Sequence, residues 1–429
     1  MRKELGASGR LHNTEGETGK PKTDQSRQKT KKKNTMKKLL LFFACLSLFY
    51  SYGKAQVTIN TNQVEIFHNL MRYSEERAGG QLRCKRATET ELQAVLDKNS
   101  NDSKLSTLID SLLNSSVLYL PKNIQNVRSF PEGTAGRDAY KIAFTVLSDF
   151  CVDMTSGMPH IWVEYWNQES RKYVDGGIAE LNANKKEIIE SIKTACKMLL
   201  PNGVDMDTEI NIHIIVDGNR GSFQFDNNVM MDIASENFVD FSYFINVLKH
   251  EMHHAYYTKW FSEKTANKER NEAESYLYQI QTGFILEGIA QRYTYNDYSV
   301  EIKQMYANKE LIAELFNEWI SMLRGVKGDS PQTAWAIFQE SFGEIAIERL
   351  KKYYPGSMDS IEYPRRPTAL YYLSYNMYNS IFESGGNEKL KYVIENPDKL
   401  LWVYNELHTD SMLVPRIPDN VVMLWQDNF

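Results

Sequence analysis

The stretch His250-Glu251-Met252-His253-His254 has the residue types and the spacing of a zinc site. It spells H-E-x-x-H inside a segment that predicts a helix, and residues four apart on a helix lie on one face. His250 and His254 can therefore direct two imidazole nitrogens at one metal ion, and such a pair is a common zinc ligand set. Glu251 projects beside them and can accept a proton from a zinc-activated water. This pattern predicts the chemistry of a zinc hydrolase.

The surroundings of the motif favour a helix with a buried face. Three of the 8 histidines of the chain fall within these five positions. A mostly apolar stripe with helical spacing accompanies them, formed by Phe244, Val247, Leu248, Glu251 and Ala255. His253 points about 60° from His250 and about 100° from His254, so we expect it to lie off the ligand face. A surface helix with incidental histidines is the alternative that the sequence leaves open.

A zinc site needs a third protein ligand, which we expect on a following helix. Metzincins carry a third histidine six residues beyond the pair, but Trp260 occupies that position. Two glutamates compete instead. Glu274 has about the spacing of a thermolysin-type ligand, whereas Glu287 precedes Gly288, and a glycine lets its helix approach the zinc helix closely. About 20 Å of helical rise separates the two glutamates, so one metal ion cannot use both.

At these residues the chain resembles the gluzincin metallopeptidases, whose third ligand is a glutamate. The sequence LEGIAQRY at residues 286–293 is similar to their E-G-x-A element. More narrowly, the chain resembles exported zinc-dependent peptidases of unassigned function from Bacteroides-type bacteria. The resemblance covers roughly residues 185–396, about half of the chain. It implies that His250, His254 and Glu287 bind one Zn²⁺ ion and that Glu251 is the general base.

A second element of related families, G-Y-x-x-G-Y, is similar to residues 367–377 of this chain. Here Leu370 and Ser374 stand in place of the two glycines. A phenol can stabilise the negative charge that develops on the scissile carbonyl oxygen, and Tyr371 is the candidate donor. The spacing of Tyr371, Tyr375 and Tyr378 also fits the simple packing of a helix core.

Together these residues predict a zinc-dependent metallopeptidase that acts on a peptide or protein substrate. Glu251 would take a proton from the attacking water and return it to the leaving amine. A non-catalytic zinc-binding exported protein and a zinc amidase acting on a non-protein amide remain as alternatives. The presence of Glu251 argues against the first, since a ligand cage alone needs no base. We expect the strand Asn228–Ile233 to be a sheet edge that pairs with an extended peptide.

The N-terminus predicts export. A charged region at Met36-Lys37-Lys38 precedes an apolar run at 39–50 and a small-residue end at Gly53-Lys54-Ala55, which is the order of a secretory signal peptide at residues 36–55. The mature chain would begin at Gln56. The polar residues 1–35 are interpreted as a spurious or disordered extension.

No membrane anchor is predicted. The apolar run of the signal peptide is too short to span a bilayer, and no later stretch reaches about 20 apolar residues. Cys45 follows Phe42-Phe43-Ala44, which is a poor lipobox. We therefore expect a periplasmic or extracellular protein without a transmembrane segment or a lipid anchor.

Composition indicates a globular protein that does not bind nucleic acid. Apolar residues make up 42% of the chain, and the formal net charge is −5 with basic residues concentrated near the N-terminus. Cys84, Cys151 and Cys196 show no C-x-x-C spacing, which excludes a cysteine metal site of that kind. They are interpreted as buried free thiols, with one disulfide at most.

The expected fold class is α+β and predominantly helical, with a small sheet whose edge strand precedes the zinc-binding helix and a helical C-terminal part. We divide the mature chain into a mostly helical region at 56–203 and a zincin-like catalytic domain at 204–429. The segments predicted as helices are Asn62–Glu76, Glu89–Leu96, Lys104–Leu113, Lys185–Leu200 and Phe241–Thr258. The predicted strands are Ile210–Val216 and Phe223–Ile233, after a turn at Gly218–Gly221. Either a strand or a helix fits Tyr140–Phe150 and Ile161–Trp166.

Overall fold

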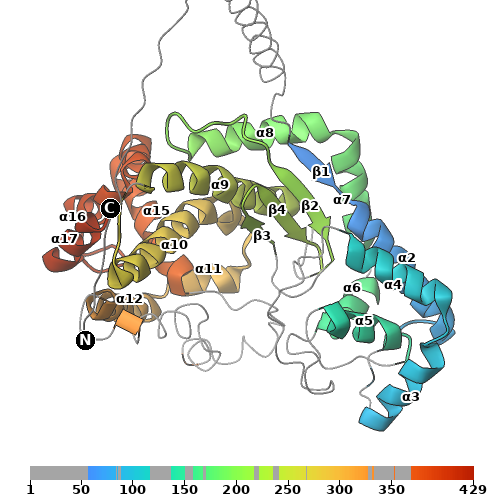
Figure 1. Cartoon of the computed structure of the whole chain (residues 1–429). Coiled ribbons are helices and arrows are strands. Elements are labelled where there is room, and N and C mark those ends of the chain that lie inside the picture. The colour runs from blue at the N-terminus through green and yellow to red at the C-terminus, as the bar shows by residue number, and fades with distance from the viewer. Residues whose placement is uncertain are drawn as a thin grey trace, which may run out of the picture. The chain divides into compact units, whose positions relative to one another are not determined.

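In the computed structural model, the β-branched run at 210–216 forms the strand β2 (Asn211–Ile215), at the centre of a four-stranded sheet (Figure 1). Its partners are β1 (Thr58–Asn60) and β4 (Asn228–Asp232), both parallel to it, and β3 (Phe223–Phe225) pairs antiparallel with β4. The strand order is β1-β2-β4-β3. Alternate residues of β2 and β4 enter the main hydrophobic core, which buries Ile212, Ile214, Val229 and Met231.

The structure describes residues 57–83, 85, 88–115, 137–149, 158–167, 171–216, 222–234, 241–266, 268–326, 331–332, 352 and 369–429. Residues Ala55–Phe429 form a compact unit by themselves. Several predicted features lie outside the described residues: the extension 1–35, the signal peptide 36–55, Cys84, Cys151 and the turn Gly218–Gly221. The division of the mature chain at residue 203 stays a prediction.

The segment Phe223–Ile233 is a hairpin and not the single strand that the sequence predicts. Asp226 has a φ of +50°, and it forms with Asn227 the two-residue turn that joins β3 to β4. Because of this turn the segment forms two strands, and β3 rather than β4 lies at the edge of the sheet. The prediction that Asn228–Ile233 is an edge was wrong, because β4 lies between β2 and β3. An edge strand does precede the zinc helix, but it is β3.

Seven helices among the described residues lie between β1 and β2 in sequence, and both ambiguous segments belong to them. They are α2 (Asn62–Ala78), α3 (Glu89–Asn99), α4 (Ser103–Asn114), α5 (Arg137–Val146), α6 (Met158–Asn167), α7 (Arg171–Ala183) and α8 (Lys185–Met198). The buried amide of Gln63 fixes α2 to the sheet, because its oxygen accepts a hydrogen bond from the Val216 nitrogen at 2.9 Å. On α7, an added Cβ at Gly177 would lie 3.0 Å from the Phe241 ring, at the start of the zinc helix.

The zinc helix is α9 (Phe241–Thr265), two turns longer than the sequence predicts. The whole predicted stripe of α9, Phe244 to Ala255, is buried. The next helix, α10 (Glu272–Thr294), begins with a capping box in which Asn271 and Glu274 bond to each other's backbone nitrogens. In Figure 1, α9 lies beside the sheet, with α8 along one side and α10 along another.

The C-terminal part is helical, as the sequence predicts. Its described elements are η1 (Tyr295–Asp297), α11 (Val300–Tyr306), α12 (Lys309–Val326), α15 (Ala369–Glu395), η3 (Pro397–Lys399), α16 (Leu400–Leu407) and α17 (Asp419–Asp427). α15 packs along α10, and a left-handed residue, Gly386 with φ +68°, interrupts it near its end. Among the described residues, none of the helices has the length and apolar composition needed to cross a bilayer.

Candidate metal centre

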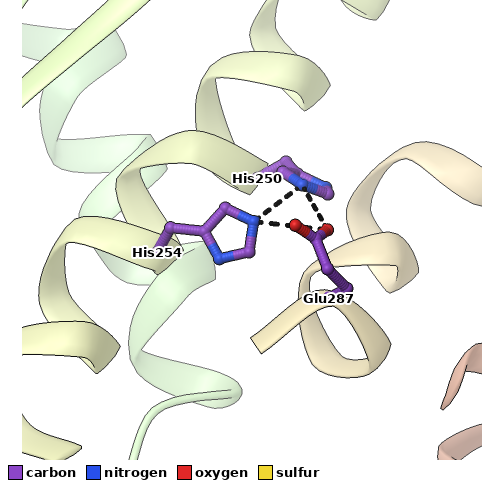
Figure 2. Close-up of side chains that lie close together, drawn as sticks. All are labelled: His250, His254 and Glu287. Carbon is purple, nitrogen blue, oxygen red and sulfur yellow. Dashed lines mark hydrogen bonds and ion pairs between the residues drawn. The ribbon is translucent and has the colours of Figure 1, made fainter. Parts of the chain in front are cut away.

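Two imidazoles of α9 converge, as the helical spacing predicts. The Nε2 atoms of His250 and His254 lie 2.9 Å apart, and both residues are buried. Figure 2 shows the two rings directed at the same point from successive turns of the helix. The Nδ1 atom of each ring is also buried and has no hydrogen-bond partner within the part of the chain that the structure describes. The two Nε2 atoms are therefore the ones that can share a ligand.

Glu287 of α10 completes the group. Its Oε2 atom lies 3.4 Å from His250 Nε2 and 3.5 Å from His254 Nε2 (Figure 2). Within the described part of the chain, His250, His254 and Glu287 are the cluster of histidine, cysteine and carboxylate side chains that could hold a metal ion. Because α9 and α10 run antiparallel and in contact, residues 37 and 33 positions apart in sequence meet at one point.

The spacing of these three atoms fits a zinc ion. Zinc–nitrogen and zinc–oxygen bonds of about 2.0–2.2 Å in a tetrahedral site place neighbouring ligand atoms about 3.3 Å apart. The two distances to Glu287 Oε2, 3.4 and 3.5 Å, match this edge, and the 2.9 Å between the imidazoles is somewhat shorter. Glu287 Oε2 is buried and, among the described residues, has no hydrogen-bond partner, so its lone pairs are available to a cation. Two imidazoles and one carboxylate are also ligand types that zinc prefers.

The charges of the cluster favour a bound cation. Burial by itself lowers the pKa of His254, but the carboxylates of Glu287 and, to a smaller extent, Glu251 together raise that pKa above the ordinary value. Burial would raise the pKa of Glu287, yet His254 and His250 hold that pKa well below its usual range. The carboxylate is thus kept ionised in a site with little solvent, where it stabilises positive charge.

Glu251 is buried beside the ligand pair. Its carboxylate is close enough to His254 to contribute to the raised pKa of that imidazole. As the neighbour of His250 on α9, it is not one of the three clustered side chains. This position, near the metal ligands but outside their set, is the one that a general base requires.

His253 lies on another side of α9, as its helical angle predicts. It is fully buried, its Nε2 atom lies 3.0 Å from the Leu199 carbonyl oxygen, and its ring stacks on Tyr257. Burial lowers the pKa of His253 to about 3, so this imidazole is neutral and donates to the carbonyl. His253 joins α9 to the end of α8 and does not join the cluster.

The two competing glutamates have different surroundings. Glu274 caps the N-terminus of α10, where its carboxylate accepts a hydrogen bond from the Asn271 backbone nitrogen at 3.0 Å. Glu287, more than three turns further along, is the one that meets the histidines. The capping box N-x-x-E is visible in the sequence, and it is the signal that separates the two glutamates.

The predicted reason for Gly288 was wrong in one respect. Its bare Cα does not face the zinc helix, because the nearest atoms to an added Cβ belong to Ser374 and Tyr378 of α15. The glycine permits a close approach of α10 to α15 instead. The sequence indicates this only indirectly. Glu287 and Gly288 are adjacent and must point about 100° apart on a helix, so they cannot both face the zinc helix directly.

Tyr371 lies half-buried on α15. Tyr371 is close enough to Tyr306 of α11 to affect its pKa. Burial is the main cause that raises the pKa of Tyr306, and Tyr371 is among the neighbouring tyrosines that raise it further. Tyr375 stacks on Tyr295 with ring centroids 4.2 Å apart, and Tyr378 is fully buried. The packing interpretation therefore describes Tyr375 and Tyr378, whereas the catalytic role of Tyr371 stays a prediction.

Comparison with known protein families matches residues 167–410 to a family described as "putative zinc dependent peptidase". The matched stretch contains all of α9, α10 and α15, and with them all three clustered side chains. No curated protein and no solved structure matches the chain. Because the matched stretch is more than half of the 429 residues, this protein belongs to that family of zinc-dependent peptidases.

Proposed function

We propose that this protein is an exported zinc metallopeptidase of the gluzincin type, which binds one Zn²⁺ ion through His250, His254 and Glu287. The observation that carries the proposal is the convergence of three zinc-type ligand atoms from two helices, all within 4.8 Å of one another. Membership in a zinc-dependent peptidase family supports it independently of that geometry.

The chemistry divides between the metal and the chain. A zinc ion with three protein ligands keeps an open position, where it lowers the pKa of a water molecule and polarises a carbonyl group. Glu251 would accept the proton of the attacking water and transfer it to the leaving amine. The low exposure of Glu251 and of both imidazoles keeps bulk solvent away from these proton transfers.

Tyr371 is proposed as the donor that stabilises the developing negative charge on the carbonyl oxygen. Its support is its position on α15, the helix that packs along the ligand helix α10. A phenol that is half-buried can both reach a substrate and keep a fixed orientation. The role would apply to the transition state more than to substrate binding.

The substrate would be an extended peptide, and β3 is the strand to receive it. β3 is an edge of the sheet, it packs against α9, and Phe225 at its end is 47% exposed. An extended peptide can add to such an edge through backbone hydrogen bonds. This assignment replaces Asn228–Ile233, because its first three residues, Asn228 to Met230, already pair with strands on both sides.

The decisive test is the Glu251→Gln variant. It removes a proton acceptor but no ligand, so zinc content should stay at one ion per chain while peptide hydrolysis falls by roughly 10³-fold or more. Zinc is measured by elemental analysis and hydrolysis with a mixed peptide library. Glu274→Gln is the matched control, since it alters a carboxylate of the same type at the capping box. Equal hydrolysis by wild type and Glu251→Gln would contradict the proposal.

Export has its own test. Expressed from Met36 in a bacterium, the protein should be recovered outside the cytoplasm with Gln56 as its first residue, because the charged, apolar and small-residue regions occur in the order that signal peptidase requires. N-terminal sequencing of the fractionated protein gives the answer. An uncleaved N-terminus in the cytosolic fraction would reject export.

A further inference from the structure

Gly288 lies at the tightest approach between α10 and α15. A Cβ added to Gly288 would be 2.5 Å from Cδ2 of Tyr378, 2.9 Å from its Cε2 and 2.8 Å from Cβ of Ser374. Real Cβ atoms essentially never come closer than 3.0 Å to other heavy atoms. No side chain larger than hydrogen therefore fits at this position without a movement of one of the two helices.

The α15 side of this contact cannot give way locally. Ser374 and Tyr378 are both fully buried, and Cβ of Ser374 is bonded directly to the backbone, so no rotamer change moves it away. The Ser374 hydroxyl donates to the Leu370 carbonyl at 2.7 Å. Asn376 donates to the Tyr306 carbonyl at 2.8 Å and so fastens α15 to α11 at the same level. The Tyr378 ring is surrounded by core side chains.

Another side of α10, about 100° around the helix from Gly288, carries the third ligand. Glu287 precedes Gly288, and its carboxylate points towards α9 while Gly288 faces α15. The position of the carboxylate relative to the two imidazoles therefore depends on how closely α10 lies against α15. To bring contacts of 2.5 and 2.8 Å to the ordinary 3.4 Å, the helices would have to separate by roughly 0.6–0.9 Å.

Metal sites do not tolerate such a displacement. Ligand atoms must lie within about 0.2 Å of their ideal distances, and a functional constellation must be held to within about 0.5 Å. We propose that Gly288 is a positioning residue for the zinc site: its missing side chain lets α15 hold Glu287 at the distance from His250 and His254 that zinc requires. The inference rests on the proposed zinc site and names the contact that sets its geometry.

A second glycine of the same helix supplies a matched control. An added Cβ at Gly283 would meet only Cδ2 of Leu370, at 3.3 Å, and that atom is the flexible end of a side chain. Gly283 also faces α15 from α10, but it lies more than one turn from Glu287. Alanine at either position should favour the helical state by a similar amount, about 1 kcal/mol, so the pair isolates the effect of the contact.

The experiment compares the full chain as wild type, Gly283→Ala and Gly288→Ala. Zinc affinity is measured by competition with a chromophoric chelator, and the geometry of the site by the visible absorption of the Co²⁺-substituted protein. We expect Gly283→Ala to match wild type in both. Gly288→Ala should bind zinc about 10–100-fold more weakly, as when a group that orients a ligand is lost, with an altered cobalt spectrum.

Ser374→Val and Ser374→Ala give a second pair in case Gly288→Ala does not fold. Valine adds a methyl group at the same contact and should weaken zinc binding several-fold, whereas alanine should not. Unaltered zinc affinity and cobalt spectrum in Gly288→Ala, or in Ser374→Val if the glycine variant is unfolded, would overturn the inference. Equal losses in Gly283→Ala and Gly288→Ala would overturn it too. A wild type that binds no zinc would instead reject the proposed function on which it rests.

Discussion

Among the described residues, a histidine meets a carboxylate at two sites, and these sites differ in ways that bear on function. In the N-terminal region, His68 of α2 lies with its Nδ1 atom 3.8 Å from an Asp175 oxygen of α7. In the candidate metal centre, His254 Nε2 lies 3.5 Å from Glu287 Oε2. The distances are similar, yet the pKa of His68 is lowered and that of His254 is raised.

The surroundings of the carboxylates explain the opposite directions. Burial is the largest single influence on the pKa of each histidine, and taken alone it would lower both pKa values. Asp175 is 49% exposed, and Arg171 and Arg72 counteract its effect on His68. Glu287 is 21% exposed, and together with Glu251 it outweighs the effect of burial on the pKa of His254. A solvated carboxylate shared with arginines leaves a histidine neutral, whereas a more enclosed one stabilises positive charge in the site.

The nitrogen atoms differ as well. His68 Nε2 lies 3.0 Å from the Tyr165 hydroxyl, and its ring stacks on the Tyr165 ring. Both nitrogens of His68 therefore face partners of the fold itself. In His250 and His254, by contrast, the Nε2 atom of each ring faces the Nε2 atom of the other ring and the carboxylate of Glu287. The histidine–carboxylate contact at His254 thus differs from that at His68 in that a second imidazole converges on it, which completes a candidate metal centre.

The largest expected effect comes from Glu287→Gln. The loss of the only carboxylate among the three proposed ligands should weaken zinc binding by about 10³-fold, which corresponds to roughly 4 kcal/mol. Asp175→Asn, the equivalent change at His68, should leave zinc affinity unaltered, and so should Glu274→Gln at the capping box. Chelator competition measures all three. The comparison fails if Glu287→Gln keeps stoichiometric zinc while Glu274→Gln loses it.

A smaller effect is expected for Tyr371→Phe. If its phenol stabilises the developing oxyanion, kcat should fall roughly 10–1,000-fold while zinc content and KM change little. Tyr165→Phe removes a phenol beside His68 and should leave kcat as it is, with a loss of about 1 kcal/mol in the free energy of unfolding. Steady-state kinetics on one peptide substrate separates the two. Unchanged kcat in Tyr371→Phe would assign this tyrosine to packing.

The smallest effect concerns pH and the His68 region. Because the pKa of folded His68 is lowered, the unfolded chain takes up a proton first as pH falls below about 6.5. Wild-type stability should therefore decrease with falling pH through this group, by at most about 1.4 kcal/mol per pH unit. His68→Phe should flatten that dependence. The free energy of unfolding is measured with urea at pH 7.5 and 5.5, with a chelator present. If it changed equally with pH in the variant and in the wild type, the pH dependence could not be assigned to His68.

Local sequence patterns predicted most of the elements around the site. The i, i+4 histidines and the stripe from Phe244 to Ala255 predicted α9, and turn residues after β-branched runs predicted β2. The bounds of α9 differ most, since the helix continues for two further turns to Thr265, where Phe261 and Thr265 are buried. The hairpin at Asp226-Asn227 escaped prediction because neither residue is a glycine, although Asp226 adopts a positive φ.

Residues distant in sequence were harder to place. Which strand is the edge depends on pairing between segments, and the local pattern of Asn228–Ile233 is the same for an edge and for an internal strand. The partner of Gly288 is likewise set by α15, about 90 residues later, so the sequence shows the small residue but not the helix it faces. Tyr371 and Tyr375, four residues apart, share a helix face on the sequence alone, and only their surroundings distinguish them.

By itself, the sequence determined the chemistry that this protein can offer. Helical periodicity is a local property, so the side-by-side imidazoles of His250 and His254 and the adjacent Glu251 follow from their spacing alone. The tertiary structure decided how that chemistry is completed: the antiparallel packing of α9 on α10 brings Glu287 to the imidazoles and leaves Glu274 at a helix cap. It also enclosed this carboxylate while leaving Asp175 half in solvent. Burial and long-range contact depend on how whole helices pack, and no spacing within one segment specifies them.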